Sequence, residues 1–344
     1  MNPLLTPVWE GDTVLNESLL PLRDVRGNIC PMRLLYEASE ILSVRSMTLE
    51  TVYEPECDYL LRDGCLILPE STRIPVMEYA DYYPKVDDGH SFARTGGGFI
   101  RFGEEDYFHR RQIAVSYRHR DTWPFETPKD KSALLPRTAK RLRSGAPLKL
   151  LIFGDSISVG LNASGTVGVP PYQKPWFDLA ADALREAMPG RELTLFNTSV
   201  VGKTSLWGRE TARENAADLC PDLCVIAFGM NDGTAQKPPE DFINNLTAII
   251  RAVSQRKREC EFILVSTTLA NKEAKGFAGL QESYLNPMLR LEESGICVAD
   301  MTSLHRALLF RKRFCDMTGN NVNHPNDFLS RVYAQLLLRT LGAL

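Results

Sequence analysis

The 344-residue sequence lacks the features that mark several specialised classes of protein. Its apolar runs are short, so no stretch of about 20 residues is apolar enough to span a bilayer. Its 40 basic and 43 acidic residues leave a net charge of −3, without the basic excess that nucleic-acid binding favours. Hydrophobic residues make up 44% and charged residues 24%, which is typical of a globular chain. We therefore expect neither a membrane nor a nucleic acid as partner.

The sequence also lacks a recognisable leader and a disulfide framework. Its first residues contain neither the basic segment nor the long apolar segment of a secretion signal. The eight cysteines are scattered, and some lie in apolar segments where a free thiol packs as a small hydrophobe. Cys220 and Cys224 are four apart, but no second Cys/His pair follows at zinc spacing, so no metal site is expected. These features predict a cytoplasmic protein in a reducing compartment.

Residues 1–122 have the pattern of antiparallel β structure. Short segments with alternating polarity or with many β-branched and aromatic residues are separated by Gly, Asp and Pro, and 62–65 (RDGC) is a plausible hairpin turn. The pattern predicts a β-sandwich, similar to a jelly roll. Residues 123–147, rich in proline and charge, are the expected linker. The predicted strand segments are 40–53, 59–70, 74–84 and 98–119.

Residues 148–344 alternate continuous apolar runs with amphipathic segments, which predicts a parallel α/β sheet covered on both faces. In such sheets ligands bind beyond the carboxyl ends of the strands. The expected strands lie near 149–153, 193–197, 223–228, 262–266 and 296–300. The clearest expected helices are 176–188, 241–257 and 328–344.

Polar motifs follow three of these apolar runs and precede the last helix. They are Gly-Asp-Ser at 154–156, Asn-x₄-Gly at 197–202, Gly-x-Asn-Asp at 229–232 and His324. Taken singly, each is more simply explained as a helix cap or a tight turn. Together they place a hydroxyl, a close-approach glycine, an amide and an imidazole at one edge of the predicted sheet, which is what acyl transfer needs.

In this order the four motifs resemble those of the SGNH (GDSL-type) hydrolases. The resemblance implies a three-layer α/β fold and ester hydrolysis, without a metal or an organic cofactor. Ser156 would be the nucleophile, and His324 the general base and then the acid. The oxyanion hole would be formed by the backbone N–H groups of Ser156 and Gly202 with the Asn231 side chain. Two more motif residues are expected to brace the turns: Asp155 and Asn197.

One position departs from the family pattern. The family usually has an Asp three residues before the histidine, and this chain has Asn321 there. An Asp would orient the imidazole and stabilise its cation by charge. We expect a neutral acceptor for His324, either the Asn321 amide oxygen or a backbone carbonyl. The carboxylates that could replace it are Asp316, Asp327 and Asp300.

The predicted arrangement, a β-sandwich followed by an SGNH domain, is also similar to carbohydrate esterases of family two. That resemblance implies removal of acetyl groups from a sugar or polysaccharide, so the expected partner is an acylated small molecule or carbohydrate. Tyr172 and Trp176, in a proline-rich stretch after the nucleophile motif, are candidate walls for a sugar ring. For Trp176 the alternative is a core position at a helix start.

Two other functions remain open. A lipid esterase or thioesterase would use the same chemistry but would need a long apolar groove, and the 161–175 loop is not strongly apolar. The second function is that of a carbohydrate-binding protein with a vestigial site, which Asn321 alone suggests.

Overall fold

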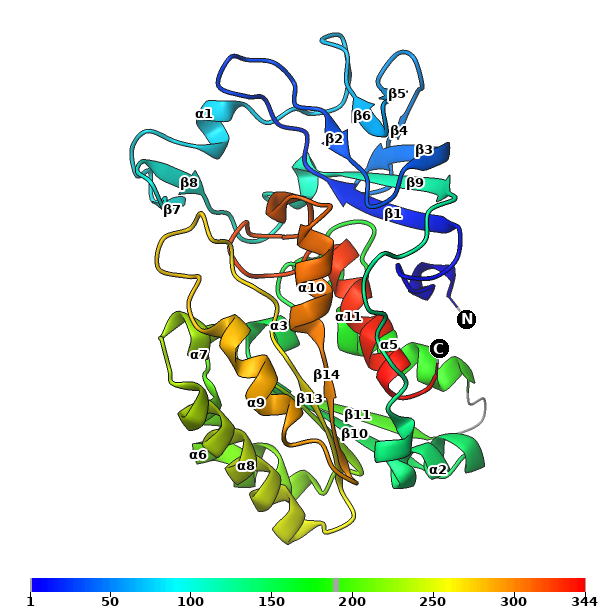
Figure 1. Cartoon of the computed structure of the whole chain (residues 1–344), viewed down its shortest axis with the longest axis vertical. Helices are drawn as coiled ribbons and strands as arrows, with labels where there is room; N and C mark the ends of the chain where they lie inside the picture. The colour runs from blue at the N-terminus through cyan, green and yellow to red at the C-terminus, as the bar shows by residue number, and fades with distance from the viewer. Residues whose placement is uncertain (1, 188–191, 344) are drawn as a thin grey trace.

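The computed structural model describes residues 2–187 and 192–343. N-terminal strands lie at one end of the elongated molecule and the α/β layers at the other (Figure 1). The last positions of two expected helices, 188 and 344, lie outside the described residues.

The parallel sheet predicted for the second part of the chain is confirmed. Five strands pair in parallel in the order β11-β10-β12-β13-β14. Their apolar side chains alternate between two buried clusters, one on each face, because successive residues of a strand point to opposite sides. The strands are β10 (Leu148–Gly154), β11 (Leu193–Asn197), β12 (Leu223–Ala227), β13 (Glu261–Val265) and β14 (Ile296–Ala299).

Helices cover both faces of this sheet and make three layers (Figure 1). On one face lie α5 (Trp176–Ala187), α10 (Met301–Leu309) and α11 (Asp327–Thr340). On the other lie α6 (Ser205–Asn215), α8 (Pro239–Arg256) and α9 (Leu285–Leu289). The shorter helices are α3 (Ser156–Val159), α4 (Ser164–Val167) and α7 (Met230–Thr234). Single 3-10 turns are η4 (Ala217–Leu219), η5 (Gln281–Tyr284) and η6 (Phe314–Asp316). No helix in the described part of the chain combines the length and apolarity needed to cross a membrane.

The N-terminal strands form small antiparallel sheets. The largest has the order β1-β9-β3-β4, beside a three-stranded sheet β2-β6-β5 and the hairpin β7-β8. The RDGC turn joins β5 to β6, with positive φ at Asp63 and Gly64 as a two-residue hairpin turn requires. The strands are β1 (Thr13–Leu19), β2 (Met32–Arg33), β3 (Ala38–Ser46), β4 (Val52–Tyr53), β5 (Leu60–Arg62), β6 (Cys65–Ile67), β7 (Ser91–Ala93), β8 (Phe99–Arg101) and β9 (Ile113–His119).

Two details of this part differ from the sequence pattern. The segment 74–84 is not a strand but contains the short helix α1 (Tyr79–Tyr82), which buries Tyr82. Strand β1 escaped prediction because a bulge between Val14 and Glu17 interrupts its alternation and leaves polar side chains facing inward.

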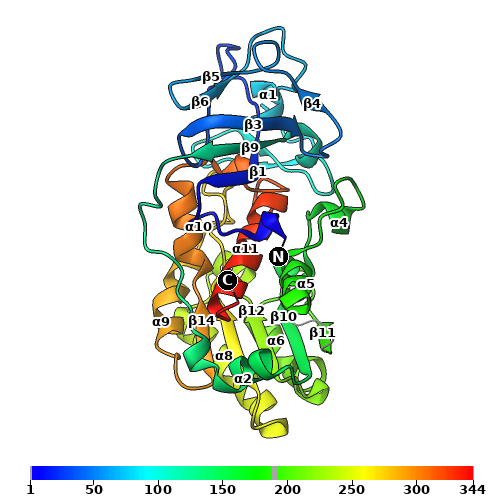
Figure 2. The same cartoon turned by 90° about the vertical axis from the view of Figure 1, so that its right-hand side faces the viewer.

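The segment between the two parts is partly helical. It contains η3 (Ser132–Leu134) and α2 (Pro136–Ser144). The Glu261 carboxylate at the start of β13 accepts the N–H groups of Arg137 and Thr138 at 2.9 and 2.6 Å. The remaining turns are η1 (Pro3–Leu5) and η2 (His109–Arg111). Figure 2 shows η1 beside α11, where Gln335 donates to the carbonyls of Leu4 and Thr6 at 3.3 and 2.9 Å.

Candidate active site

The Gly-Asp-Ser motif forms a tight turn at the carboxyl end of β10. Gly154 ends the strand, Asp155 caps α3, and Ser156 is the first residue of the helix. The Asp155 carboxylate accepts the Ile157 N–H at 3.0 Å and so satisfies a donor that the helix start leaves free. A Cβ at Gly154 would lie 2.3 Å from the Ala227 carbonyl oxygen, so only glycine permits β10 and β12 to approach this closely.

Two side chains hold this turn from outside. Asn197 at the end of β11 donates its amide to the Ser158 carbonyl at 2.7 Å, as expected of a bracing residue. The Trp176 indole N–H donates to the Ile157 carbonyl at 3.0 Å. Trp176 is 1% exposed and stacks on Tyr333, so the prediction that it walls a sugar site is wrong. Its ring packs in the core because α5 enters the sheet face at this residue.

The other aromatic candidate, Tyr172, lies in the loop before α5. Its side chain is 61% exposed, and its N–H donates to the Val169 carbonyl at 2.9 Å. The ring is thus available to a ligand, and its contact with a sugar stays a prediction.

The structure brings Ser156 and His324 into hydrogen-bond contact, although they are far apart in the sequence. Ser156 Oγ lies 2.9 Å from His324 Nε2, and both residues are buried. The opposite ring nitrogen, Nδ1, lies 2.8 Å from Asn162 Oδ1. The Asn162 amide nitrogen donates to the Glu105 carbonyl at 3.1 Å, so its oxygen faces the ring. Nδ1 therefore carries the proton, and Nε2 is free to accept the serine proton.

Asn162, and not Asn321, is therefore the neutral acceptor for His324. The Asn321 side chain points toward the N-terminal strands, where it accepts the Tyr82 hydroxyl at 3.1 Å and donates to the Arg101 carbonyl at 3.0 Å. These two bonds engage the Asn321 side chain away from the imidazole, on a backbone with a φ of 67°. The prediction that Asn321 orients His324 is wrong for this reason.

The carboxylates weighed from the sequence have other partners. Asp316 pairs with Arg313 at 2.7 Å, and Asp327 accepts the Ser164 N–H at 2.8 Å. Asp300 caps α10 by accepting the Ser303 N–H at 2.8 Å.

The loop that carries His324 is fixed by its own side chains. Asn320 Oδ1 accepts three backbone N–H groups, including that of His324 at 3.1 Å. Thr318 donates its hydroxyl to the His324 carbonyl at 2.9 Å. A Cβ at Gly319 would lie 2.3 Å from the Asn162 Cβ, so glycine lets this loop approach the imidazole acceptor.

A carboxylate from the N-terminal part of the chain also faces the imidazole. Glu104, in the loop after β8, places Oε2 3.4 Å from His324 Nδ1, and its side chain is 41% exposed. Partial burial raises the pKa of Glu104, but hydrogen bonding to His324, the charge of His324 and the Asn320 amide outweigh it, so the pKa is lowered overall. Glu104 is therefore ionised at neutral pH.

Besides the Ser156 N–H at the end of β10, the expected oxyanion donors are Gly202, in the loop after β11, and Asn231, in α7 after β12; these two strands flank β10. Gly202 has a φ of 74°, and in the described chain the N–H groups of Ser156 and Gly202 donate to no other residue. The Asn231 amide donates one hydrogen to the Lys203 carbonyl at 2.9 Å, which leaves its second hydrogen for a ligand.

Two buried acids lie in and near the Gly-Asp-Ser turn, Asp155 and Asp232. Burial, together with the nearby charge of Asp232, raises the pKa of Asp155 to about 7. Burial also raises the pKa of Asp232, whose carboxylate accepts the Ser205 N–H at 3.0 Å and its hydroxyl at 2.5 Å. The bonds of Asp232 tie the start of α6 to α7, whereas Asp155 caps α3.

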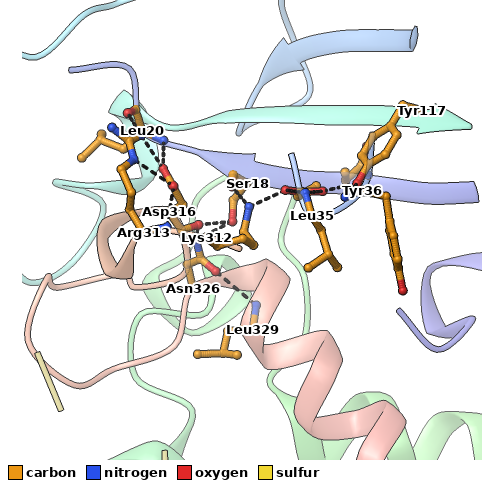
Figure 3. Close-up of polar contacts among 12 residues, drawn as sticks. Ser18, Leu20, Leu35, Tyr36, Tyr117, Lys312, Arg313, Asp316, Asn326 and Leu329 are labelled. Atoms are coloured by element: carbon orange, nitrogen blue, oxygen red, sulfur yellow. Dashed lines mark hydrogen bonds and ion pairs between the residues drawn. The ribbon is translucent and has the colours of Figure 1, made fainter. Parts of the chain in front are cut away.

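A buried polar network joins β1 to the segment before His324 (Figure 3). Lys312 and Glu17 form an ion pair in which both side chains are fully buried. Glu17 also accepts the Tyr117 hydroxyl at 2.6 Å and the Leu35 N–H at 2.9 Å, so its charge is well satisfied. Lys312 donates in addition to the Ser18 carbonyl at 3.0 Å.

The same network continues to the start of α11 (Figure 3). Asp316 accepts the Leu20 N–H at 2.8 Å, and Asn326 donates to the Ser18 hydroxyl at 2.9 Å. Asn326 also caps α11 by accepting the Leu329 N–H at 3.2 Å. The residues on both sides of His324 are thus anchored to β1.

The geometry of the four motifs agrees with a comparison against known protein families. The model of the GDSL-like Lipase/Acylhydrolase family matches residues 152–327, just over half of the chain. The chain belongs to this family. Among the described residues, no group of three or more His, Cys, Asp or Glu side chains is arranged to hold a metal ion.

Family members and solved structures resemble parts of the chain. An arylesterase from Vibrio mimicus is 34% identical over 110 residues, which are 32% of this chain and 50% of the relative. The chain thus spans about half the length of this curated relative. A two-domain esterase (CEX) active on acetylated mannans, co-crystallised with mannopentaose, has a TM-score of 0.49 and 20% identity over 61% of this chain and 53% of that one. LAE5, an alpha/beta hydrolase from the metagenome of Lake Arreo, Spain, has a TM-score of 0.48 and 22% identity over 58% and 97%.

Within this GDSL-like fold, sequence reasoning missed two residues that face the imidazole. Asn162 is six residues after Ser156, and its left-handed backbone with a φ of 64° is a conformation that asparagine adopts readily. This preference of asparagine is the feature of the sequence that could have pointed to Asn162. Glu104 lies in the other part of the chain, in an acidic stretch (EED) that resembles many solvated turns, so no local pattern pointed to it.

Proposed function

We propose that the protein is a serine carboxylic-ester hydrolase that acts through Ser156 and His324. The observation that carries the proposal is the 2.9 Å contact between Ser156 Oγ and His324 Nε2, with the opposite ring nitrogen held by an acceptor. This is the geometry that a nucleophile and its general base require. It also argues against a vestigial site.

In the proposed reaction, Ser156 Oγ attacks the ester carbonyl carbon while its proton passes to His324 Nε2. The negative charge that develops on the carbonyl oxygen is stabilised by the N–H groups of Ser156 and Gly202 and by the Asn231 amide. The protonated imidazole then gives its proton to the departing alcohol, which leaves an acyl-serine. Water, deprotonated by His324, attacks that acyl group, releases the acid and restores Ser156.

We propose an O-acetylated sugar or polysaccharide as substrate. Polar side chains meet at His324: Asn162 and Glu104 face its ring, and Asn320 donates to Glu104. Polar groups beside the reacting pair suit a hydroxyl-rich substrate better than a long acyl chain. The likeness of the two-part arrangement to carbohydrate esterases of family two supports the same class.

A second candidate is an esterase or thioesterase for longer acyl chains. Val200 and Val201, which precede Gly202 in the oxyanion loop, are 38% and 52% exposed. An apolar surface beside the oxyanion donors would suit an acyl tail.

The two candidates differ in their acyl-length preference. We would measure kcat/KM on p-nitrophenyl acetate, butyrate, octanoate and palmitate, and acetate release from acetylated mannan and xylan. The first proposal expects the acetate to be the best p-nitrophenyl ester and acetate to be released from a glycan. A maximum at octanoate or longer would favour the second. Absence of turnover on every ester would reject both.

We also propose that residues 1–122 and 148–344 are two domains joined by 123–147, and that the first is a small β-sandwich. The sheets β1-β9-β3-β4 and β2-β6-β5 contribute to one apolar core, in which Val44 and Val115 of the first accompany Met32 and Leu66 of the second. Loops of this part line the active site through Glu104, so it takes part in substrate selection.

A further inference from the structure

Glu104 occupies a position toward His324 that no residue of the α/β part fills. Among the described residues it is the only acid with an oxygen within 4.0 Å of a His324 ring nitrogen. Its other oxygen accepts the Asn320 amide at 3.2 Å, and Asn320 also holds the backbone of the His324 loop. The carboxylate is therefore fixed to the loop whose histidine it faces.

A negative charge here would matter when the imidazole takes up the serine proton. Asn162 holds the ring through a neutral amide, which orients it but adds no charge against the imidazolium. The carboxylate oxygen at 3.4 Å adds that charge, reduced by solvent because the side chain is 41% exposed. Orientation and charge, which one Asp combines in the usual triad, are then divided between two residues.

We propose that Glu104 is a positioning residue that supplies the negative charge absent at Asn321, so that the N-terminal part of the chain completes the catalytic apparatus. This inference rests on the proposed ester hydrolysis through Ser156 and His324.

The described side chains that interact most strongly with Glu104 are His324 and Asn320, from the loop before α11, and Asn162, from the loop after α3. Only His324 among them is able to carry a charge. The pKa of Glu104 is lowered, so its carboxylate is ionised at neutral pH.

The kinetic test replaces Glu104 by glutamine, which keeps the size and removes the charge. Glu104→Gln is expected to lower kcat/KM on p-nitrophenyl acetate roughly fivefold to tenfold and to move the acid limb of its pH profile to lower pH. The deficit should shrink in high salt, since salt screens a part-exposed charge in the wild type. The control is Asp106→Asn, which removes a charge from the same loop but from a carboxylate that faces Arg110. It should stay within about twofold of wild type.

A second measurement does not depend on turnover. The Hε1 resonance of His324, assigned by its loss in His324→Gln, is titrated by NMR in wild type, Glu104→Gln and Asp106→Asn. Glu104→Gln alone should lower the titration midpoint, by roughly half to one pH unit. An unchanged midpoint would overturn the role of Glu104 even if the enzyme is an esterase. A lowered midpoint in a protein without esterase activity would instead reject the proposed function and retain the charge contact.

Discussion

At the scale of single residues, His324 is oriented by an amide that lies on the nucleophile's own loop. The Asn162 oxygen lies 2.8 Å from Nδ1, and glycine at 319 allows the two loops to touch. The side chain three positions before the histidine, Asn321, instead links the loop to Tyr82 and Arg101. We therefore expect the two asparagines to have separable roles, one in catalysis and one in stability.

Removing each amide should separate these roles. Asn162→Ala leaves the imidazole without its acceptor, and kcat/KM is expected to fall roughly tenfold to a hundredfold with a small change in stability. Asn321→Ala leaves buried groups without partners and should lower the free energy of unfolding by about 1–3 kcal/mol. Kinetics on p-nitrophenyl acetate and urea unfolding measure both effects. A larger loss of kcat/KM in Asn321→Ala would contradict the assignment.

The buried acid beside the nucleophile makes stability depend on pH. Burial raises the pKa of Asp155 to about 7, above its ordinary value of 3.8, so between these limits the folded state binds more protons than the unfolded state. The resulting stability is complete below the unfolded pKa and is lost as pH rises through about 7. Asp155→Asn keeps an oxygen for the Ile157 N–H but does not ionise.

Urea unfolding at about pH 5 and about pH 8 tests this effect. From the lower to the higher pH, the free energy of unfolding of the wild type should fall by on the order of 2–4 kcal/mol more than that of Asp155→Asn. Asp63→Asn, in the exposed β5–β6 turn, should behave like wild type. Parallel pH dependence in all three proteins would show that Asp155 is not the titrating group.

At the scale of elements, strand β1 anchors the segments on either side of the loop that contains His324. Glu17 and Ser18 face inward at the β1 bulge and bind Lys312 and Asn326, on either side of the catalytic loop. These bonds satisfy the polar side chains that the strand buries. Breaking one member of a buried ion pair leaves an uncompensated charge, which is costly.

Lys312→Met should therefore lower the free energy of unfolding by about 3–5 kcal/mol, because the Glu17 carboxyl remains buried without its ion-pair partner. The double variant Lys312→Met, Glu17→Gln should recover part of that loss. Urea unfolding gives both values. If the single variant loses less free energy of unfolding than the double variant, the ion pair does not contribute as described.

The elements that sequence patterns predict best are those with local signals. A parallel sheet produces continuous apolar strands with polar residues after their carboxyl ends, so the sequence alone predicts that the four motif residues lie at one edge. Those residues are Ser156, Gly202, Asn231 and His324. Asn162 and Glu104 could not be predicted in this way, because their proximity to the imidazole depends on how distant loops meet. Trp176 was open to two interpretations, since an aromatic residue at a helix start suits a core or a pocket.

At the scale of the whole molecule, one apolar core runs from the N-terminal sheet into the α/β layers. It includes Leu19 and Tyr117 from the strands at one end and Leu150 and Val332 near the parallel sheet. η1 also docks on α11 through Gln335. The two parts are therefore expected to unfold together.

Tryptophan fluorescence measures this cooperativity, because Trp9 and Trp123 belong to the first part and the linker, and Trp176 and Trp207 to the α/β part. Variants that keep only one of these pairs have the other tryptophans replaced by phenylalanine, and in each variant the urea transitions followed by fluorescence and by far-UV circular dichroism should coincide. Transitions at separate urea concentrations would show two independent folding units.

The central claim, that Ser156 is a nucleophile activated by His324, is tested most directly by mapping a covalent fluorophosphonate adduct with tandem mass spectrometry. The account predicts one modified serine, Ser156, with labelling abolished in Ser156→Ala and strongly slowed in His324→Gln. The Ser156→Ala variant should also lose about 10⁴-fold or more in kcat on p-nitrophenyl acetate while it unfolds like wild type. An adduct on another serine, or turnover largely retained in Ser156→Ala, would contradict it.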